Sequence, residues 1–195
     1  LPGYLAPITR IGGGEVRVDK AINAKTVAWD AEQKTGSLSF GYATLTGTQI
    51  FEKTVVVRNY SKKDRTYKIN ADFRYADDAA SGAVKIIAPS TIRVRGNSLN
   101  CFTVKLKVDA NKLPVWDLNG GPYGGDGYRL QNFEFDGYIT ISDATDNVHL
   151  AWQILPHRAA NVTPTSTKVK LNNGVASLKL KNIMSALDGN VDAFS

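Results

Sequence analysis

The two histidines and the single cysteine are the side chains in this sequence best suited to catalysis or metal binding. His149 and His157 lie eight residues apart. In a continuous strand that spacing separates them by roughly 27 Å, too far to share a metal. No serine lies in a nucleophile-elbow sequence, and Cys101 belongs to no Cys–His signature. We therefore expect no catalytic residues in this chain and no enzymatic activity from it alone.

A glycine- and aromatic-rich loop, residues 116–132, carries the other candidate chemistry. Three of its side chains offer oxygen atoms that calcium accepts, although their spacing is not that of an EF-hand: Asp117, Asn119 and Asp126. Three aromatic side chains can face sugar rings or a partner surface: Trp116, Tyr123 and Tyr128. The alternative is an ordered crossover between two sheets. The sequence thus requires no cofactor, and calcium is the metal this loop would accept.

The stretch from Phe133 to Ala160 predicts a β-hairpin around which the remaining elements must be arranged. Apolar and polar residues alternate from Phe133 to Ser142, which places Glu134 and Asp136 on the polar face. Polar residues 143–147 turn the chain, and the alternation resumes with His149 on the polar face. Pro156 cannot donate to a ladder, so we expect it to end the second strand. Such a hairpin has one apolar face and must pack on another sheet.

Further alternating segments predict an all-β, antiparallel sandwich of the immunoglobulin or fibronectin type III kind. They span residues 27–29, 38–42, 50–58, 67–75, 84–87, 92–95 and 102–108. Asp109 is expected to cap a single helical turn after the last of them. Shared strand parity predicts ten side chains inside the sandwich: Tyr67, Ile69, Phe73, Phe102, Val104, Leu106, Phe135, Ile139, Leu150 and Trp152.

The formal charge of +6 invites a nucleic-acid interpretation, but its distribution does not favour one. The basic residues come in alternating pairs, typical of the solvated face of strands: Arg93/Arg95, Lys105/Lys107, Lys168/Lys170 and Lys179/Lys181. No nucleic-acid-binding motif accompanies them. No run of about 18 apolar residues is present, so we expect no membrane span.

The two ends of the sequence are expected to lie outside the sandwich, which we assign to residues 25–160. In residues 1–24, the glycines at 12–14 precede a short helix over 15–24. These glycines suit a crowded turn better than a phosphate site, because the Lys-Ser/Thr of a P-loop is absent. Residues 161–195 begin with a linker and then form a hairpin across Asn172-Asn173-Gly174, the first strands of a following β-domain. We expect the apolar side chains of both ends to dock, self-associate or stay mobile.

Several segments resemble a known family in their order along the chain. Gly12–Ile22, GGGEVRVDKAI, is similar to the last helix of a subtilisin-like protease domain, although Arg17 stands where that family usually has Asp or Asn. Thr54–Ser61, Phe102–Leu113, Asp136–Ile141 and Leu150–Ala160 resemble the fibronectin type III-like domain behind the catalytic domain of large exported subtilases. Leu178–Phe194 resembles the first strands of the next domain in such proteins.

This resemblance implies the non-catalytic β-sandwich portion of a secreted or cell-envelope serine endopeptidase. The family's catalytic motifs would precede Leu1, in a sequence to which residues 1–24 form the tail. The implied role is to cap and orient the protease domain, in the same or a separate polypeptide, and to extend the cleft for a polypeptide substrate. The alternative is a carbohydrate-binding or adhesive immunoglobulin-like module of a cell-surface protein.

Overall fold

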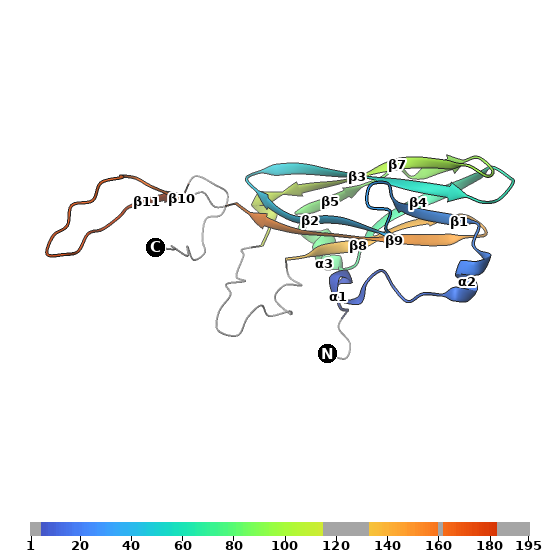
Figure 1. Ribbon diagram of the computed structural model, residues 1–195, viewed down its shortest axis with the longest axis horizontal. Helices are drawn as coiled ribbons and strands as arrows, with labels where there is room; N and C mark the ends of the chain where they lie inside the picture. The colour runs from blue at the N-terminus through green and yellow to red at the C-terminus, as the bar shows by residue number, and fades with distance from the viewer. Residues whose placement is uncertain (1–4, 115–132, 160–161, 183–195) are drawn as a thin grey trace.

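The computed structural model describes residues 5–114, 133–159 and 162–182, and two packed sheets form its body (Figure 1). One sheet has four strands in the order β1 (Thr26–Asp30), β3 (Thr48–Asn59), β7 (Leu99–Asp109) and β5 (Val84–Ile87). The other has five in the order β2 (Ser37–Leu45), β9 (Asn147–Arg158), β8 (Phe135–Ser142), β4 (Arg65–Phe73) and β6 (Thr91–Val94). The predicted all-β sandwich is confirmed.

The core between the sheets is built from the alternation seen in the sequence. Nine of the ten predicted core side chains are buried: Tyr67, Ile69, Phe102, Val104, Leu106, Phe135, Ile139, Leu150 and Trp152. Phe73 is partly buried and packs edge-to-face on Trp152, with ring centroids 5.2 Å apart. The paired basic residues at 93/95 and 105/107 are exposed while their neighbours Val94 and Leu106 are buried, as strand parity predicts. The pairs at 168/170 and 179/181 are also exposed, but so are Val169 and Leu180 between them, so strand parity does not account for their exposure.

The hairpin β8–β9 is present, but its second strand is longer than expected. Pro156 lies inside β9, which continues to Arg158. The prediction that this proline ends the strand is therefore wrong. Beyond Ile154, β9 has no partner residue in β8 and pairs only with β2, where Pro156 is opposite Ala43. A strand with a neighbour on one side only is a setting in which proline is tolerated.

Strand β2 departs from the antiparallel pattern, because it pairs with β9 in parallel. Its register shifts between Ser39 and Tyr42, where Gly41 has φ +73. Such an irregularity changes which side chains face inward. Leu38 and Leu45 are consequently buried, whereas Tyr42 is exposed. The expected simple alternation of residues 38, 40 and 42 does not hold.

Short helices and a second hairpin complete the described residues. Helix α1 (Ile8–Ile11) was not predicted, α2 (Val18–Asn23) is shorter than the expected 15–24 and buries no side chain, and α3 (Ala76–Ser81) follows β4. The predicted turn after Asp109 is η1 (Ala110–Lys112), with the Asp109 carboxylate accepting from the Asn111 N–H. Among these residues, no helix is long and apolar enough to cross a membrane.

The C-terminal hairpin pairs β10 (Val162–Pro164) with β11 (Leu180–Asn182) and extends away from the sandwich (Figure 1). Asn172 and Val175 form a bridge around Asn173 and Gly174, whose φ angles of 52 and 80 are typical of a tight hairpin turn. The turn therefore lies where the sequence predicts it. The strands of the hairpin are farther from the turn than expected, because residues 169, 171 and 178 lie outside the ladder.

Gly137 allows the closest approach between strands of the five-stranded sheet, and it provides a test of the fold. It is paired with Trp152 and Phe73, and a Cβ atom there would overlap the carbonyl oxygen of Asp72. Gly137→Ala therefore requires a backbone shift, and we expect it to lower the free energy of unfolding by about 1–3 kcal/mol. Urea denaturation measures this.

Gly36→Ala is the matched control, because a Cβ atom at Gly36 meets no atom within 4 Å. We expect that substitution to leave the free energy of unfolding nearly unchanged. Equal midpoints for the two variants would contradict the close approach at Gly137.

Candidate functional site

The two histidines and the cysteine lie at separate places on the sandwich. His149 is exposed on β9, as expected, and His157 lies near the end of the same strand, stacked on Tyr42 with 3.2 Å between the Tyr42 hydroxyl and Nδ1. Burial lowers the pKa of His157. Cys101 is an exposed free thiol. The described residues contain no group of three or more His, Cys, Asp or Glu side chains able to hold a metal.

The candidates in the 116–132 loop lie outside the described residues. They are the calcium candidates Asp117, Asn119 and Asp126 and the aromatic residues Trp116, Tyr123 and Tyr128. The described residues instead concentrate their buried polar groups where the N-terminal segment meets the sandwich. We call residues 5–25 the N-terminal strap.

The strap begins on the outer face of the five-stranded sheet, over a buried carboxylate. Asp136 alternates with the core residues of β8 and so faces away from the core, yet it is fully buried. The backbone N–H of Ile8 donates to Asp136 Oδ2 at 2.6 Å, and Ile8 itself is only 6% exposed. Since α1 packs against β9, this turn of helix covers the carboxylate. The first contact therefore joins residues 128 positions apart in the sequence.

Three more side chains, those of Glu134, Arg74 and Tyr75, form hydrogen bonds with the same part of the strap. The Thr9 hydroxyl donates to Glu134 Oε2 at 2.6 Å, and Glu134 is also buried. The Arg74 guanidinium donates from Nε to the carbonyl oxygen of Ala6 at 2.6 Å, and the Tyr75 hydroxyl donates to that of Leu5 at 2.7 Å. We call Arg74, Tyr75, Glu134 and Asp136 the seat. The seat binds consecutive residues of the strap through both backbone and side-chain groups.

Two glycines with positive φ follow the part of the strap that the seat binds. Gly12 and Gly14 have φ +73 and +124, conformations that other residues rarely adopt. His149 Nε2 lies 2.9 Å from the Gly13 carbonyl oxygen, to which it donates, and its ring packs edge-to-face on Tyr138. The imidazole on the polar face thus holds the chain. After this contact the strap is exposed. Val16, and Val18 and Ile22 on α2, are all more than half exposed.

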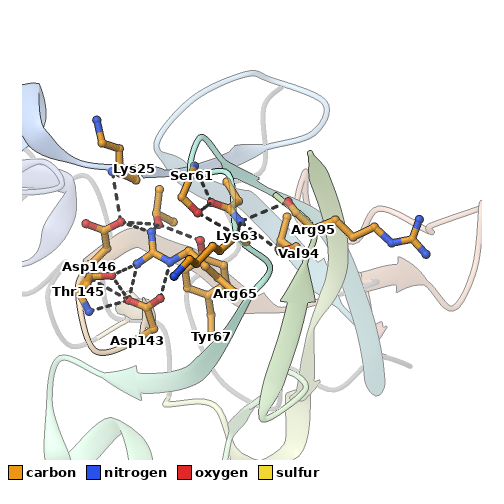
Figure 2. A network of polar contacts seen from close by, with 12 residues as sticks. Lys25, Ser61, Lys63, Arg65, Tyr67, Val94, Arg95, Asp143, Thr145 and Asp146 are labelled. Carbon is orange, nitrogen blue, oxygen red and sulfur yellow. Dashed lines mark hydrogen bonds and ion pairs between the residues drawn. The ribbon is translucent and has the colours of Figure 1, made fainter. Parts of the chain in front are cut away.

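The far end of the strap is held at a corner of the sandwich (Figure 2). Asp146 Oδ2 accepts from the Lys25 N–H at 3.2 Å and from the Thr26 hydroxyl at 2.7 Å. Arg65 on β4 donates to the same oxygen at 2.6 Å and to both oxygens of Asp143. The Thr26 hydroxyl also lies 3.0 Å from the Tyr67 hydroxyl. We call Arg65, Asp143 and Asp146 the corner cluster.

The turn at Ser61 and Lys63, beside the corner cluster in Figure 2, is held by the buried amide of Asn59. Asn59 Nδ2 donates to the carbonyl oxygens of Lys63 at 2.8 Å and of Val94 at 3.2 Å. Its Oδ1 accepts from the N–H and the hydroxyl of Ser61. The predicted turn after β3 is therefore closed by one side chain whose polar atoms are all paired.

The charges of the corner cluster stabilise one another. Burial raises the pKa of Asp143, but hydrogen bonds from Arg65 and from the N–H groups of Thr145 and Asp146 outweigh it and hold that pKa well below its usual range. The pKa of Asp146 is lowered as well, because bonds from Thr26 and Arg65 outweigh its burial. The hydrogen bonds that Arg65 donates to the Asp143 carboxylate raise the pKa of Arg65. These groups are fully ionised at neutral pH and have a structural role.

At the seat the carboxyl pKa values are raised, whereas at the corner cluster they are lowered. Burial raises the pKa of Asp136, and the Ile8 N–H and the Arg74 charge only partly offset it. Asp78 on α3 lies close enough to interact with it, and burial together with the charges of Asp77 and Asp136 raises the pKa of Asp78 to about 7. Asp136 Oδ1 and Asp78 Oδ2 are buried without a hydrogen-bond partner among the described residues. Negative charge at the seat is therefore only partly compensated.

The sequence predicts Glu134 and Asp136 on a wet face, and that prediction is wrong about their exposure. Strand parity places them correctly on the outer face, but both are buried there, in contact with Ile8 and Thr9 of the strap. Chemically, the seat and the corner cluster bind polypeptide at fixed points.

Comparison with known proteins gives structural likeness only. No family model matches the chain, and no curated protein matches it. Among solved structures, the FixG-related protein from Vibrio parahaemolyticus is 11% identical with a TM-score of 0.40, covering 67% of this chain and 94% of that one.

A family 123 glycoside hydrolase from Clostridium perfringens is 9% identical with a TM-score of 0.43, over 67% of this chain and 27% of that one. The PapD-like domain 7 of human CEP192 is 11% identical with a TM-score of 0.34, over 68% and 84%. With identities and TM-scores this low, these likenesses carry no conclusion about this chain.

Proposed function

We propose that this chain is the non-catalytic β-sandwich portion of a secreted or cell-envelope subtilisin-like serine endopeptidase. In this role it caps the protease domain and holds it in a defined orientation. The proposal begins from the resemblance of Gly12–Ile22 to the last helix of such a domain. The observation that carries it is the seat, which binds the residues just before that segment through buried carboxylates.

Fixing the strap at both ends is what an orienting module requires. The seat holds residues 5–9, and the corner cluster holds Lys25 and Thr26. A strap held at two points fixes the position of the sandwich relative to the domain before it. A free linker does not.

The exposed apolar side chains of α2 and of Val16, two residues before it, fit the same role. Val16, Val18 and Ile22 are 78%, 60% and 74% exposed, and apolar groups of this size gain free energy when a partner covers them. In the proposed assembly they lie against the protease domain. The polypeptide substrate then meets a cleft that the protease domain and the sandwich form together.

Hydrogen exchange tests this proposal on two forms of the protein. The amides of α2 are expected to exchange rapidly in the chain alone and to be protected when a subtilisin-like catalytic domain is joined before residue 5. The β8–β9 amides serve as the internal control, since the core protects them in both forms. Casein hydrolysis is expected only from the joined form.

Three results contradict the proposal. Casein turnover by the chain alone indicates a catalytic site of its own. Specific retention on a glycan array favours the carbohydrate-binding alternative. Unchanged exchange of α2 in the joined form means that the protease domain does not lie on the strap.

A further inference from the structure

We propose that the seat is a pH-controlled latch on the N-terminal strap: it holds residues 5–11 firmly when the Asp136–Asp78 pair carries a proton and loosens when both carboxyls ionise. The inference concerns the contact within this chain. It shares the strap with the proposed function but holds whatever domain precedes the strap.

The geometry places ionisable groups directly beneath the strap. Asp136 is fully buried, with one oxygen accepting from Ile8 on α1 and the other without a partner among the described residues. Ile8 is itself buried in this contact, so the docked strap contributes to the burial of the carboxyl. The ionisation of Asp136 is therefore coupled to docking.

The groups that face Asp136 do not neutralise it. Just before β8 lies Glu134, a second buried acid, and α3 contributes Asp78 with Asp77 beside it. Lys112 on η1 lines the same pocket as these two aspartates. Arg74 is the cation that favours the ionised form, but it is also engaged with the Ala6 carbonyl and the Tyr138 hydroxyl. Tyr75 contributes a hydroxyl that donates to Leu5. Acids thus outnumber bases at the docked seat.

The remaining titratable groups near the strap do not produce the same switch. Arg10 on α1 is exposed. His149 on β9 donates to the Gly13 carbonyl from Nε2, and both the neutral and the protonated imidazole can carry that hydrogen. The pH response is therefore assigned to the carboxyls.

The direction of the response follows from the raised pKa values of Asp136 and Asp78. Burial raises the pKa of Asp136, so above the ordinary carboxyl pKa the docked state binds more protons than the undocked state. Docking is therefore strongest at acid pH and weakens as the pH rises through the raised pKa of Asp136. At higher pH, both states are ionised and the dependence levels off. A neutral Asp136 still accepts the Ile8 hydrogen bond, so protonation does not undo the latch.

Amide hydrogen exchange on the whole chain tests the latch. The reporters are the hydrogen-bonded amides of Ile8 and Gly12, whose protection is followed from pH 5 to pH 8 after correction for intrinsic exchange rates. In the wild type, we expect protection to fall by about tenfold or more across this range. Asp136→Asn retains an acceptor for Ile8 but cannot ionise, and Asp78→Asn removes the second acid. Each is expected to flatten the response, and the double variant to abolish it.

Two controls separate the carboxyls from other causes. Asp64→Asn changes an exposed acid on the β3–β4 turn, and His149→Gln removes the imidazole but keeps a donor for Gly13. Both are expected to retain the wild-type slope. Protection of the β8–β9 amides verifies that each variant is folded, and Asp78→Asn, at a partly exposed position, keeps the test usable if Asp136→Asn is not folded.

The proposal is overturned by equal protection at pH 5 and pH 8 in the wild type. It is also overturned if the variants at 78 and 136 keep the wild-type slope, or if His149→Gln alone removes it. Because the readout is exchange and not proteolysis, these outcomes are independent of whether a protease domain precedes the strap.

Discussion

Replacing Trp152 with alanine is expected to lower the free energy of unfolding by about 3–5 kcal/mol, the range for deleting a large buried aromatic side chain. Trp152 is fully buried between Leu38 on β2 and Gly137 on β8. Its indole packs edge-to-face on Phe73, and Nε1 donates to the Asp72 carbonyl oxygen at 3.0 Å. The substitution therefore removes apolar contacts and a hydrogen bond, and it leaves a cavity at the centre of the five-stranded sheet.

Urea denaturation followed by circular dichroism measures this change. His149→Ala, three positions earlier on the exposed face of the same strand, is expected to change the free energy of unfolding by no more than about 0.5 kcal/mol. Trp152→Phe retains the aromatic ring but loses the Nε1–H, so its effect should lie between the two. A larger loss for His149→Ala than for Trp152→Ala would contradict the assignment of faces.

Replacing Arg65 with methionine is expected to lower the free energy of unfolding at pH 7 by roughly 3 kcal/mol, because removal of one partner leaves buried charges uncompensated. Asp143 and Asp146 would then remain ionised without their guanidinium (Figure 2). The side chains of Arg65, Asp143 and Asp146 are 10%, 15% and 13% exposed, so solvent screens this cluster only weakly.

The loss of unfolding free energy caused by Arg65→Met should become smaller at low pH. In the wild type, the pKa of Asp143 and of Asp146 is lowered, so their contribution is present above the ordinary carboxyl pKa and is lost as the pH falls through the folded values. Without Arg65 this contribution is largely absent at every pH. The difference between the variant and the wild type should therefore shrink when unfolding is measured at pH 3.

Arg93→Met is the matched control for the corner cluster. Arg93 also pairs with a carboxylate, that of Asp64 at 3.0 Å, but its side chain is 74% exposed. An exposed pair contributes little, because water and salt screen it. We expect a much smaller effect than for Arg65→Met. Similar losses for the two variants would mean that the corner cluster is no more stabilising than a surface ion pair.

The sequence predicted only part of the candidate site. The aromatic and calcium candidates of the 116–132 loop lie outside the described residues, and the groups that bind the strap were not predicted as a site. Asp136 and Glu134 were placed on the correct face of their strand with the wrong exposure. Strand periodicity reports which face a side chain occupies, but it does not report what another segment places on that face.

The sequence by itself determined the features that depend on near neighbours along the chain. Alternation at Tyr67, Phe102 and Leu150 predicts their burial, because a strand turns successive side chains to opposite faces. The Asp109 cap and the Asn173-Gly174 turn followed from side-chain and backbone preferences that act over a few residues.

Only the tertiary structure decided the pairings between distant segments. The parallel register of β2 against β9 tolerates Pro156 within a strand, and no local preference encodes it. Arg65 meets Asp143 and Asp146 across 78 and 81 positions, and Ile8 meets Asp136 across 128. Charge compensation and burial at these points depend on which surfaces the folded chain brings together. The tertiary structure therefore decides the direction of the carboxyl pKa shifts at the seat and at the corner cluster.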